Sequence, residues 1–401
     1  MLGMSKKMSS NSLRVLLVQQ FFPAYRVPVF CKLAAHDLID LTLVHGTSAG
    51  VAPGEAGLAN VNKDMPFRVI AGPIPCLRWR SNAILWFSLA VKTVADEHFD
   101  VVIHGFATRW ASLGRVRKVQ QKKGGKFILW GIGFSRTKTP LLKLLRMRMV
   151  DQADALILYS KRDRKHYMDM GACPAKLFVA RNSIDLCPID QAINDWSDGQ
   201  LQHFRHEKGL EKGPVLLSVG RLAEDKKMDL LLKCAAELKR IYPRLKVVLV
   251  GDGPHKRNLL ALTHKLGLNN NVIIIGQVTK ENELAPWFLC SDLVVAPGQI
   301  GLLAAHAHAY GRPLITSDNP VMHSPEIEIV KPGKTGVLYP YGDIKALTST
   351  VKSLLADASK RESMSAAAFR HARSELGVPN MVNGVLRAIS YATGQPLSLF
   401  T

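Results

Sequence analysis

Short apolar runs, many of them rich in β-branched residues, alternate along the chain with longer stretches of helical periodicity. This alternation is typical of parallel sheets whose strands are joined by crossover helices. Strands are predicted at 13–18, 39–44, 101–104, 127–130, 155–158 and 177–180, and again at 215–219, 246–250, 272–275, 293–296 and 313–316. Helices are predicted at 81–97, 109–123, 228–241, 255–266, 281–289 and 301–310. The pattern therefore predicts the α/β fold class with doubly wound sheets.

A polar, turn-rich segment, "CPIDQAINDWSDGQLQHFRHEKGLEKGP", separates two such halves. A single core stops growing at roughly 250–300 residues, so a chain of 401 residues is expected to form two domains. The predicted organisation is a disordered leader at 1–12, a Rossmann-like domain at 13–187, a linker at 188–212, a second Rossmann-like domain at 213–378 and a helical tail at 379–401. Two sheets joined in this way are expected to face each other across a cleft, with ligands beyond the carboxyl ends of the strands.

Composition excludes several classes of protein. No apolar run approaches the roughly 20 residues that span a bilayer, and "MLGMSKKMSSNS" lacks the apolar core of a secretory signal. The six cysteines include no CxxC pair, which argues against a zinc site or a disulfide framework and favours reduced cytosolic thiols. No metal site and no cofactor are predicted. No aromatic-rich module for nucleic acid is present either.

The formal net charge of +21 implies an anionic partner. Residues 101–150 hold twelve Lys or Arg and no Asp or Glu. Within them "TPLLKLLRMRMV" places Thr at a helix N-cap and Pro in the first turn, then mixes Leu and Met with cations. The helix is either a membrane-surface helix or a basic helix packed on a sheet. For the whole block we favour contact with anionic lipid headgroups, and hence a peripheral position on a membrane.

The loops after the second set of strands are candidates for anion binding. Arg221 and Lys226 lie five residues apart around a turn that enters a helix, so both side chains can converge on one anion. The planar guanidinium of Arg221, the ammonium group of Lys226 and the N–H groups at the start of the helix would together suit a diphosphate. The alternative is a basic turn that is only solvated. Further glycines stand at predicted strand ends, and each is a weak signal alone: Gly220, Gly251, Gly253 and Gly276.

A glycine turn followed by a helix, "APGQIGLLAAHAHAYGRPLIT", forms residues 296–316. Gly298 and Gly301 allow a chain reversal that presents the backbone N–H groups of Gly301 and Leu302 to a phosphate. His306 lies one turn after Leu302, whereas His308 points nearly the opposite way, so the two histidines cannot share a metal. We expect one histidine to face a site and the other to be packed or exposed.

Taken in order, five segments resemble the nucleotide-sugar domain of retaining glycosyltransferases of family 4, which have the GT-B fold. They are "VGRLAEDKKMDLLL", "VLVGDGP", "IGQV", "APGQIGLLAAHAHAYGRPLI" and "PGKTGVLYPYGD", and the resemblance extends over about residues 177–375. It implies that Arg221 and Lys226 hold the donor diphosphate, that Gly301 and Leu302 cap it, and that Asn182 of "VARNSID" marks the start of the second domain. It also implies sugar transfer with retention of configuration and without a metal ion.

The chain departs from this family at two positions. Where the family commonly has two glutamates eight positions apart, this chain has Gly298 and His306, which we interpret as a subfamily variant. His306 can still hydrogen-bond a hydroxyl or the departing phosphate. Glu326 and Glu328 offer replacement carboxylates that would share one face of an extended segment, unless they are two surface glutamates before a turn. The catalytic candidates are therefore Arg221, Lys226 and His306, with the named glycines, Leu302 and the two glutamates on the donor side.

The first domain gives weaker signals for the acceptor. Its segment "QQFFPAYRVPVF" lacks the glycines of a dinucleotide fingerprint, which argues against a nicotinamide enzyme. Arg26 follows the first strand, His104 ends the strand "VVIH", and Arg136 closes "LWGIGFSR". We predict these three residues on the acceptor side, although His104 is equally well explained as a strand-end histidine and Arg136 as part of a turn.

The function expected from these features is a cytoplasmic, membrane-associated retaining glycosyltransferase of the hexosyltransferase type. Its donor would be a nucleotide sugar and its acceptor a lipid-linked glycan or polysaccharide, as in exopolysaccharide or lipopolysaccharide biosynthesis. Two alternatives remain open. One is a sugar-nucleotide epimerase or phosphorylase on the same architecture, and the other is a non-catalytic scaffold that binds polyanions.

Overall fold

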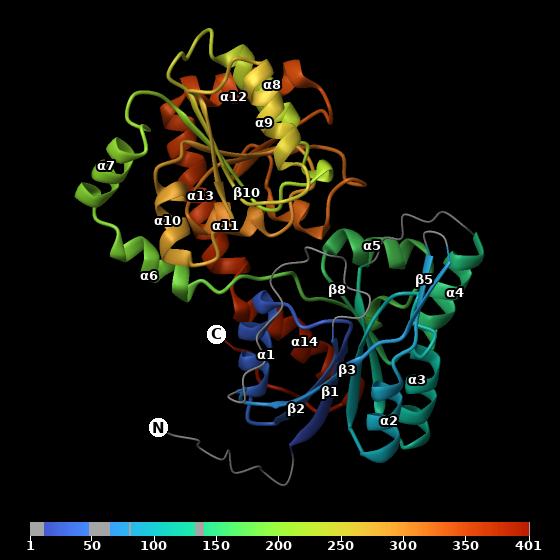
Figure 1. The fold of residues 1–401 in the computed structure, drawn as a ribbon. Coiled ribbons are helices and arrows are strands. Elements are labelled where there is room, and N and C mark those ends of the chain that lie inside the picture. Colours follow the sequence, from blue (N-terminus) through green and yellow to red (C-terminus); the bar gives the residue numbers. More distant parts are fainter. Residues whose placement is uncertain (1–11, 48–64, 80–81, 133–139, 401) are drawn as a thin grey trace. The chain divides into compact units, whose positions relative to one another are not determined.

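The chain divides into two compact units in a computed structural model that describes residues 12–47, 65–79, 82–132 and 140–400 (Figure 1). The first unit contains the described residues up to Arg181 together with those from Val378 onward, and the second contains Asn182–Gly377. The leader predicted at 1–12 lies outside the described residues except for its last position. Each unit has one parallel sheet with helices packed against it, as the α/β pattern predicts.

The first unit has a seven-stranded parallel sheet in the order β3-β2-β1-β6-β7-β8-β9. Its strands are β1 (Leu13–Gln19), β2 (Ile39–Thr47), β3 (Arg68–Pro73), β6 (Val101–Gly105), β7 (Lys126–Gly131), β8 (Ala155–Leu158) and β9 (Leu177–Val179), beside an antiparallel hairpin of β4 (Cys76–Trp79) and β5 (Asn82–Leu85). Its helices are η1 (Ala24–Arg26), α1 (Val27–Ala34), α2 (Ser88–Asp96), α3 (Leu113–Lys122), α4 (Pro140–Asp151), α5 (Lys161–Asp169), η2 (Pro174–Lys176) and α14 (Val378–Thr393).

Both faces of this sheet are buried. Along β1, Val15 and Leu17 enter the core that α1 and α14 cover, whereas Leu16 and Val18 enter the core on the α2 and α3 side. Burial on both faces explains why the central strands are almost continuously apolar in sequence. The predicted helix at 81–97 is wrong in its first part, because residues 82–85 pair with β4 and the helix begins only at Ser88.

The last helix returns to the first unit. Along α14, Met381, Val385 and Ile389 pack into the core formed with β7 and β8. Gly384 allows this close approach, since a Cβ atom there would lie 2.5 Å from the carbonyl oxygen of Val179. The segment that was predicted as a tail therefore completes the core of a unit that begins more than three hundred residues earlier.

The second unit has a six-stranded parallel sheet in the order β12-β11-β10-β13-β14-β15. Its strands are β10 (Val215–Val219), β11 (Lys246–Val250), β12 (Val272–Gly276), β13 (Leu293–Ala296), β14 (Leu314–Ser317) and β15 (Gly336–Tyr339). Its helices are α6 (Cys187–Asp195), α7 (Asp198–Glu207), η3 (Glu224–Lys226), α8 (Met228–Leu238), α9 (Lys256–Lys265), α10 (Glu281–Leu289), α11 (Leu303–Ala309), η4 (Pro325–Ile329), α12 (Ile344–Ala356) and α13 (Ala358–Glu375).

The segment predicted as a linker, 188–212, is largely helical and belongs to the second unit. Ile189 and Ala192 of α6 are buried in the core that includes α10, and Asp190 forms an ion pair with Arg373 of α13. Ser197 and Gln200 form a capping box at the start of α7. The segment is polar overall, which suggested a linker, but Ile189 and Ala192 give α6 a narrow apolar face that packs on the core of the second unit.

The order of strands in the second sheet reverses between β10 and β13. Open parallel sheets bind ligands beyond the carboxyl ends of the strands at such a reversal. The loops that leave β10 and β13 contain Gly220 to Lys227 and Pro297 to Leu302, which are the segments in which the sequence predicts donor binding.

Candidate functional site

Three hydrogen bonds join the loops that follow β10 and β13. The backbone N–H groups of Gly298 and Gln299 donate to the carbonyl oxygens of Lys226 and Asp225 at 3.1 and 3.0 Å. In return, the Nζ of Lys226 donates to the carbonyl oxygen of Gln299 at 2.8 Å. The two loops thus form one structure, in which the lysine of the first loop is held by the backbone of the second.

The amine of Lys226 lies beside the turn that starts α11. A Cβ atom on Gly301 would lie 3.9 Å from Lys226 Nζ, and the φ of +55° at Gly301 belongs to the left-handed region that favours glycine. Burial lowers the pKa of Lys226, and the charge of Arg221 lowers it further, whereas Asp225 and Glu326 oppose the shift. Lys226, Arg221 and Glu326 therefore share one electrostatic environment, while Arg221 itself is exposed.

Glu326 is buried on η4, after β14. Asn182 Nδ2 donates a hydrogen bond to Glu326 Oε1, and Glu326 Oε2 is buried without a hydrogen-bond partner among the described residues. Glu328 is half-buried and does not share a face with Glu326, because Pro325–Ile329 forms a 3-10 helix in which residues two apart point about 120° apart. The extended geometry considered for the two glutamates is therefore absent, and only Glu326 is brought near Lys226.

Gly298 has no space for a side chain. A Cβ atom there would lie 2.2 Å from the carbonyl oxygen of Asp225 and 2.8 Å from that of Lys226. Both contacts are with backbone, so no rotamer change can relieve them. The close approach of the two loops therefore leaves no room for a glutamate at this position.

His306 is paired with a carboxylate that the sequence did not single out. His306 Nε2 lies 3.7 Å from Glu281 Oε2 at the start of α10, and the hydroxyl of Tyr310 donates to Glu281 Oε1 at 2.6 Å. Burial raises the pKa of Glu281, but His306 and Tyr310 together outweigh it and the net shift is downward, so the carboxylate is ionised. Glu281 opens a predicted helix, and the only signal in the sequence was its position after β12.

His308 belongs to the core and is the packed histidine of the predicted pair, whereas the site-facing role of His306 stays a prediction. His308 is fully buried and its ring lies 5.5 Å from that of His371 on α13. Burial, reinforced by His371, lowers the pKa of His308 to about 3. Its side chain is therefore neutral near neutral pH and contributes packing.

The glycines at the strand ends allow the backbones of neighbouring strand ends to lie in close contact. Gly251 N–H donates to the carbonyl oxygen of Gly276 at 2.7 Å, and Gly220 N–H donates to that of Val250 at 2.9 Å. A Cβ atom on Gly251 would lie 1.9 Å from the Gly220 oxygen, and one on Gly253 would lie 2.4 Å from the Leu222 oxygen. Close packing of the strand ends accounts for these glycines, and their contact with a donor stays a prediction.

In the first unit, aromatic side chains surround Arg26 near the carboxyl ends of the strands. Its guanidinium carbon is 5.3, 5.1 and 5.2 Å from the ring centroids of Tyr25, Trp130 and Tyr159. Nη1 of Arg26 also donates to the sulfur of Met381 on α14 at 3.2 Å. Cation–π contacts hold the charge in place beside the exposed ring of Tyr25.

His104 is a core residue. Its ring is fully buried 5.4 Å from that of Trp110, its Nδ1 lies 2.8 Å from the carbonyl oxygen of Gly105, and burial lowers its pKa to about 4. A side chain with no exposed surface cannot contact an acceptor, so the acceptor-side prediction for His104 is corrected. Arg136 lies outside the described residues.

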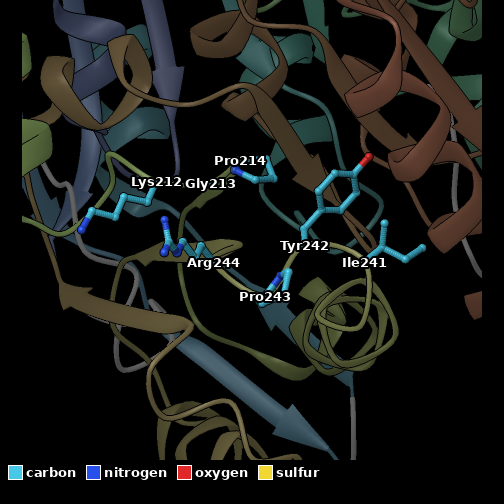
Figure 2. A pocket seen from close by; sticks show the side chains of 7 residues that line it. All are labelled: Lys212, Gly213, Pro214, Ile241, Tyr242, Pro243 and Arg244. Carbon is cyan, nitrogen blue, oxygen red and sulfur yellow. The ribbon is translucent and has the colours of Figure 1, made fainter.

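A hollow of about 230 Å³ lies at the opposite edge of the second sheet (Figure 2). It is lined by Lys212, Gly213, Pro214, Ile241, Tyr242, Pro243 and Arg244, which precede β10 and β11. Because it adjoins the amino ends of the strands, it is separate from the loops that carry Lys226 and Glu326. Among the described residues, no group of three or more His, Cys, Asp or Glu side chains is placed to hold a metal ion.

Comparison with known proteins finds a family match over part of the chain. Residues 201–371 match the family of glycosyl transferases group 1. The chain is 26% identical over 235 residues to alpha-D-kanosaminyltransferase of Streptomyces kanamyceticus, covering 58% of this chain and 58% of the relative. It is 25% identical over 294 residues to a GDP-mannose-dependent alpha-(1-6)-phosphatidylinositol monomannoside mannosyltransferase of Mycolicibacterium smegmatis, covering 69% and 73%. The chain thus spans less than two thirds of the length of the first of these relatives.

Solved structures establish the fold. Anabaena HepE in complex with UDP superimposes with a TM-score of 0.72 at 16% identity, covering 93% of this chain and 98% of that one. Sucrose-phosphate synthase from Thermosynechococcus elongatus gives a TM-score of 0.65 at 16% identity, covering 92% and 96%. Together with the two parallel sheets, these matches confirm the predicted GT-B-like fold.

Proposed function

We propose that this chain, whose residues 201–371 match the glycosyl transferases group 1 family, is a retaining hexosyltransferase that uses a nucleoside diphosphate sugar. The observation that carries the proposal is the fixed amine of Lys226, held between two loops at the carboxyl edge of the second sheet with Arg221 and Glu326 in its electrostatic environment. The family resemblance implies that the reaction needs no metal ion. No helix of the described part of the chain is long and apolar enough to cross a membrane.

Lys226 and Arg221 would stabilise the departing diphosphate. Bond breakage gives the sugar an oxocarbenium-like character while negative charge collects on the diphosphate. Groups that are already oriented stabilise such charge without reorganising, and removing one of them typically lowers turnover about 10²–10³-fold. The hydrogen bond from Lys226 to Gln299 fixes the amine before substrate arrives, and the backbone N–H groups of Gly301 and Leu302 would complete the diphosphate contact.

Glu326 would replace the carboxylate that the family has at the Gly298 position. It is buried near Lys226, and its Oε2 atom has no partner among the described residues. A carboxylate so placed can accept a hydroxyl of the transferred sugar or stabilise positive charge on its ring. His306 would contact a hydroxyl of the donor, and Glu281 would act as the positioning residue for His306.

The substitution Glu326→Gln is expected to lower donor turnover about tenfold or more, corresponding to about 1.4 kcal/mol of transition-state stabilisation. Glutamine keeps an acceptor for Asn182 but loses the negative charge. Glu328→Gln, on the same short helix, is the matched control and is expected to leave turnover unchanged. Steady-state kinetics of donor hydrolysis or transfer measure both, and equal rates for the two variants would rule out this role for Glu326.

The acceptor would be a lipid-linked glycan or polysaccharide used in bacterial surface glycan biosynthesis at the cytoplasmic face of the membrane. Two observations support this part of the proposal. One is the mycolicibacterial relative, which is named a phosphatidylinositol monomannoside mannosyltransferase. The other is the basic block at 101–150 of the first unit. Arg26 and Arg136 are the proposed contacts for an anionic group of the acceptor.

Thermal-shift screening against UDP-, GDP- and ADP-linked hexoses tests the proposal. A ligand that binds only the folded chain stabilises it by about 2.7 kcal/mol at a hundredfold excess over Kd, which raises the melting temperature. We expect one nucleotide class to do so. No shift with any nucleotide sugar would contradict the proposal and favour a polyanion-binding scaffold.

Analysis of the products formed without an acceptor tests the remaining alternative. A new sugar nucleotide or sugar phosphate would favour an epimerase or phosphorylase.

A further inference from the structure

Helix α4 is oriented with Arg146 inside and three of its leucines outside. Arg146 is 9% exposed, whereas Leu141, Leu144 and Leu145 are 73%, 67% and 42% exposed. A surface helix of a globular protein normally turns its apolar stripe to the core and its charges to water. The exposed set, which we name the leucine face, is therefore unexplained by the folding of this chain alone.

Contacts of Arg146 fix this orientation. Its Nη2 donates to the carbonyl oxygen of Ile132 at 2.9 Å and to the hydroxyl of Tyr167 on α5 at 2.8 Å. Its guanidinium also lies 4.8 Å from the ring centroid of Phe106, in the loop after β6. Val150 is buried one turn further along the same side. These anchors keep the opposite side of α4, which includes the leucine face, turned outward.

Spacing along α4 gathers the leucines on one stripe with a cation at its end. Residues 141, 144 and 145 are related by three and four positions, and Arg148 extends the same stripe by a further turn. Arg148 and Lys143 are both exposed. A leucine stripe flanked by cations is the composition of helices that lie in a membrane interface.

A second apolar edge adjoins the same part of the first unit. Leu77 and Ile84 of the β4–β5 hairpin are 70% and 50% exposed. The hairpin is tied to the loop after β6 by a bridge between Leu85 and Trp110, and Phe106 of that loop contacts Arg146 of α4. Figure 1 shows β5 and α4 at one flank of the first unit, with α1 and α14 at the other.

Charge identifies the occupant of this surface. Residues 101–150 carry twelve Lys or Arg without an Asp or Glu, and polybasic segments are attracted to anionic lipid surfaces. Arg146 is buried, whereas Lys143 and Arg148 are exposed beside the leucine face. A second copy of the chain would place the same surface patch on both subunits of a symmetric pair, so that Lys143 and Arg148 of both copies lie in one interface. Like charges oppose that arrangement, whereas phosphate headgroups complement it.

We infer that α4 is the membrane-docking element of this chain. The leucine face enters the headgroup region of an anionic bilayer, and Lys143 and Arg148 contact lipid phosphates at its rim. The role of this docking rests on the proposed function: docking would keep the enzyme close to a lipid-linked acceptor.

The test is co-sedimentation of the full chain with vesicles of equal parts phosphatidylglycerol and phosphatidylcholine, compared with vesicles of phosphatidylcholine alone. We expect preferential binding to the anionic vesicles that weakens as salt screens the charges. Leu144→Glu is expected to weaken that binding about tenfold or more, because it removes apolar burial and adds a repelled charge. Leu260→Glu is the matched control: Leu260 is a 50% exposed leucine on α9 of the second unit, and its variant should bind as the unaltered chain does.

Equal binding of the Leu144→Glu variant and the unaltered chain would overturn the inference, as would equal binding to both kinds of vesicle. A chain that ignores vesicles but forms a dimer that Leu144→Glu dissociates would assign the leucine face to a second copy instead. The melting-temperature shift with nucleotide sugars separates this result from the proposed function. If nucleotide sugars raise the melting temperature but the chain does not bind vesicles, only the membrane docking by α4 is refuted. If the chain binds vesicles but no nucleotide sugar raises the melting temperature, only the transferase assignment is refuted.

Discussion

Replacement of Lys226 by methionine is expected to reduce turnover of the donor about 10²–10³-fold, the usual cost of removing one preoriented group that stabilises developing charge. Affinity for the nucleoside diphosphate should fall by about 10–100-fold, since a hydrogen bond to a charged group contributes about 1.5–3 kcal/mol. Methionine keeps the length of the stem and removes the charge and the hydrogen bond to Gln299. Titration calorimetry with UDP and GDP, with steady-state kinetics, measures both effects.

Lys227 provides the matched control. Its Nζ lies 3.9 Å from Glu224, and methionine there should leave nucleotide affinity unchanged. If Lys227→Met and Lys226→Met weaken binding equally, the effect is one of net charge, and Lys226 has no specific contact with a diphosphate.

The pH dependence of nucleotide binding follows from the lowered pKa of Lys226. Diphosphate prefers the protonated amine, so affinity falls as pH rises through the pKa of this group. Because burial, followed by the charge of Arg221, lowers that pKa, the decline should begin at a lower pH than an ordinary lysine would give. Lys226→Arg keeps its proton over the same range and should abolish the decline.

Gly298→Glu, which places a glutamate where the family commonly has one, is expected to abolish donor binding instead of improving activity. The Cβ atom of any side chain at 298 would overlap the carbonyl oxygens of Asp225 and Lys226, which are backbone atoms of the loop that presents Lys226. Overpacking of this kind costs about 1–3 kcal/mol of folding free energy, occasionally more. Separation of the two loops would also break the hydrogen bond from Lys226 to Gln299.

Two further variants identify the cause of that loss. Gly298→Ala adds only the overlapping Cβ atom and should reproduce most of the loss of donor binding. That result would show that the carboxylate is not responsible. Gly199→Glu places the same side chain in open space on α7 and should leave stability and nucleotide binding unchanged. Urea unfolding and the melting-temperature shift with nucleotide measure both properties, and a Gly298→Glu protein that gains activity would show that the loops can separate.

The sequence alone determined the central architecture. Every strand predicted from an apolar run is present. For the central strands the reason is burial on both faces, which requires apolar side chains at consecutive positions. The spacing of Arg221 and Lys226 around a turn also indicated the loop that the structure joins to the 298–302 turn. Of the edge strands, β9 and β12 were predicted, whereas β3 and β15 were missed. β3 is half-exposed and carries no continuous apolar run.

Tertiary structure decided which of several equivalent residues meet. Glu326 and Glu328 were indistinguishable in sequence, and the 3-10 turn of η4 selected Glu326. Glu281 reaches His306 because α10 and α11 are neighbours in space, although 25 positions separate the two residues along the chain. His104 ends its strand as a functional residue would, yet neighbouring rings enclose it.

Periodicity specifies which residues share a face of a helix, but not which face another element covers. In α4 the same pattern suits a helix packed by its leucines or one packed by Arg146, and only Tyr167, Phe106 and Ile132 decided between them. In α14 the apolar stripe was readable, whereas its docking on the first unit depended on a core assembled from the other end of the chain. Local sequence therefore determined the elements and their apolar faces, and long-range packing determined their partners, because burial depends on the neighbours that the completed fold supplies.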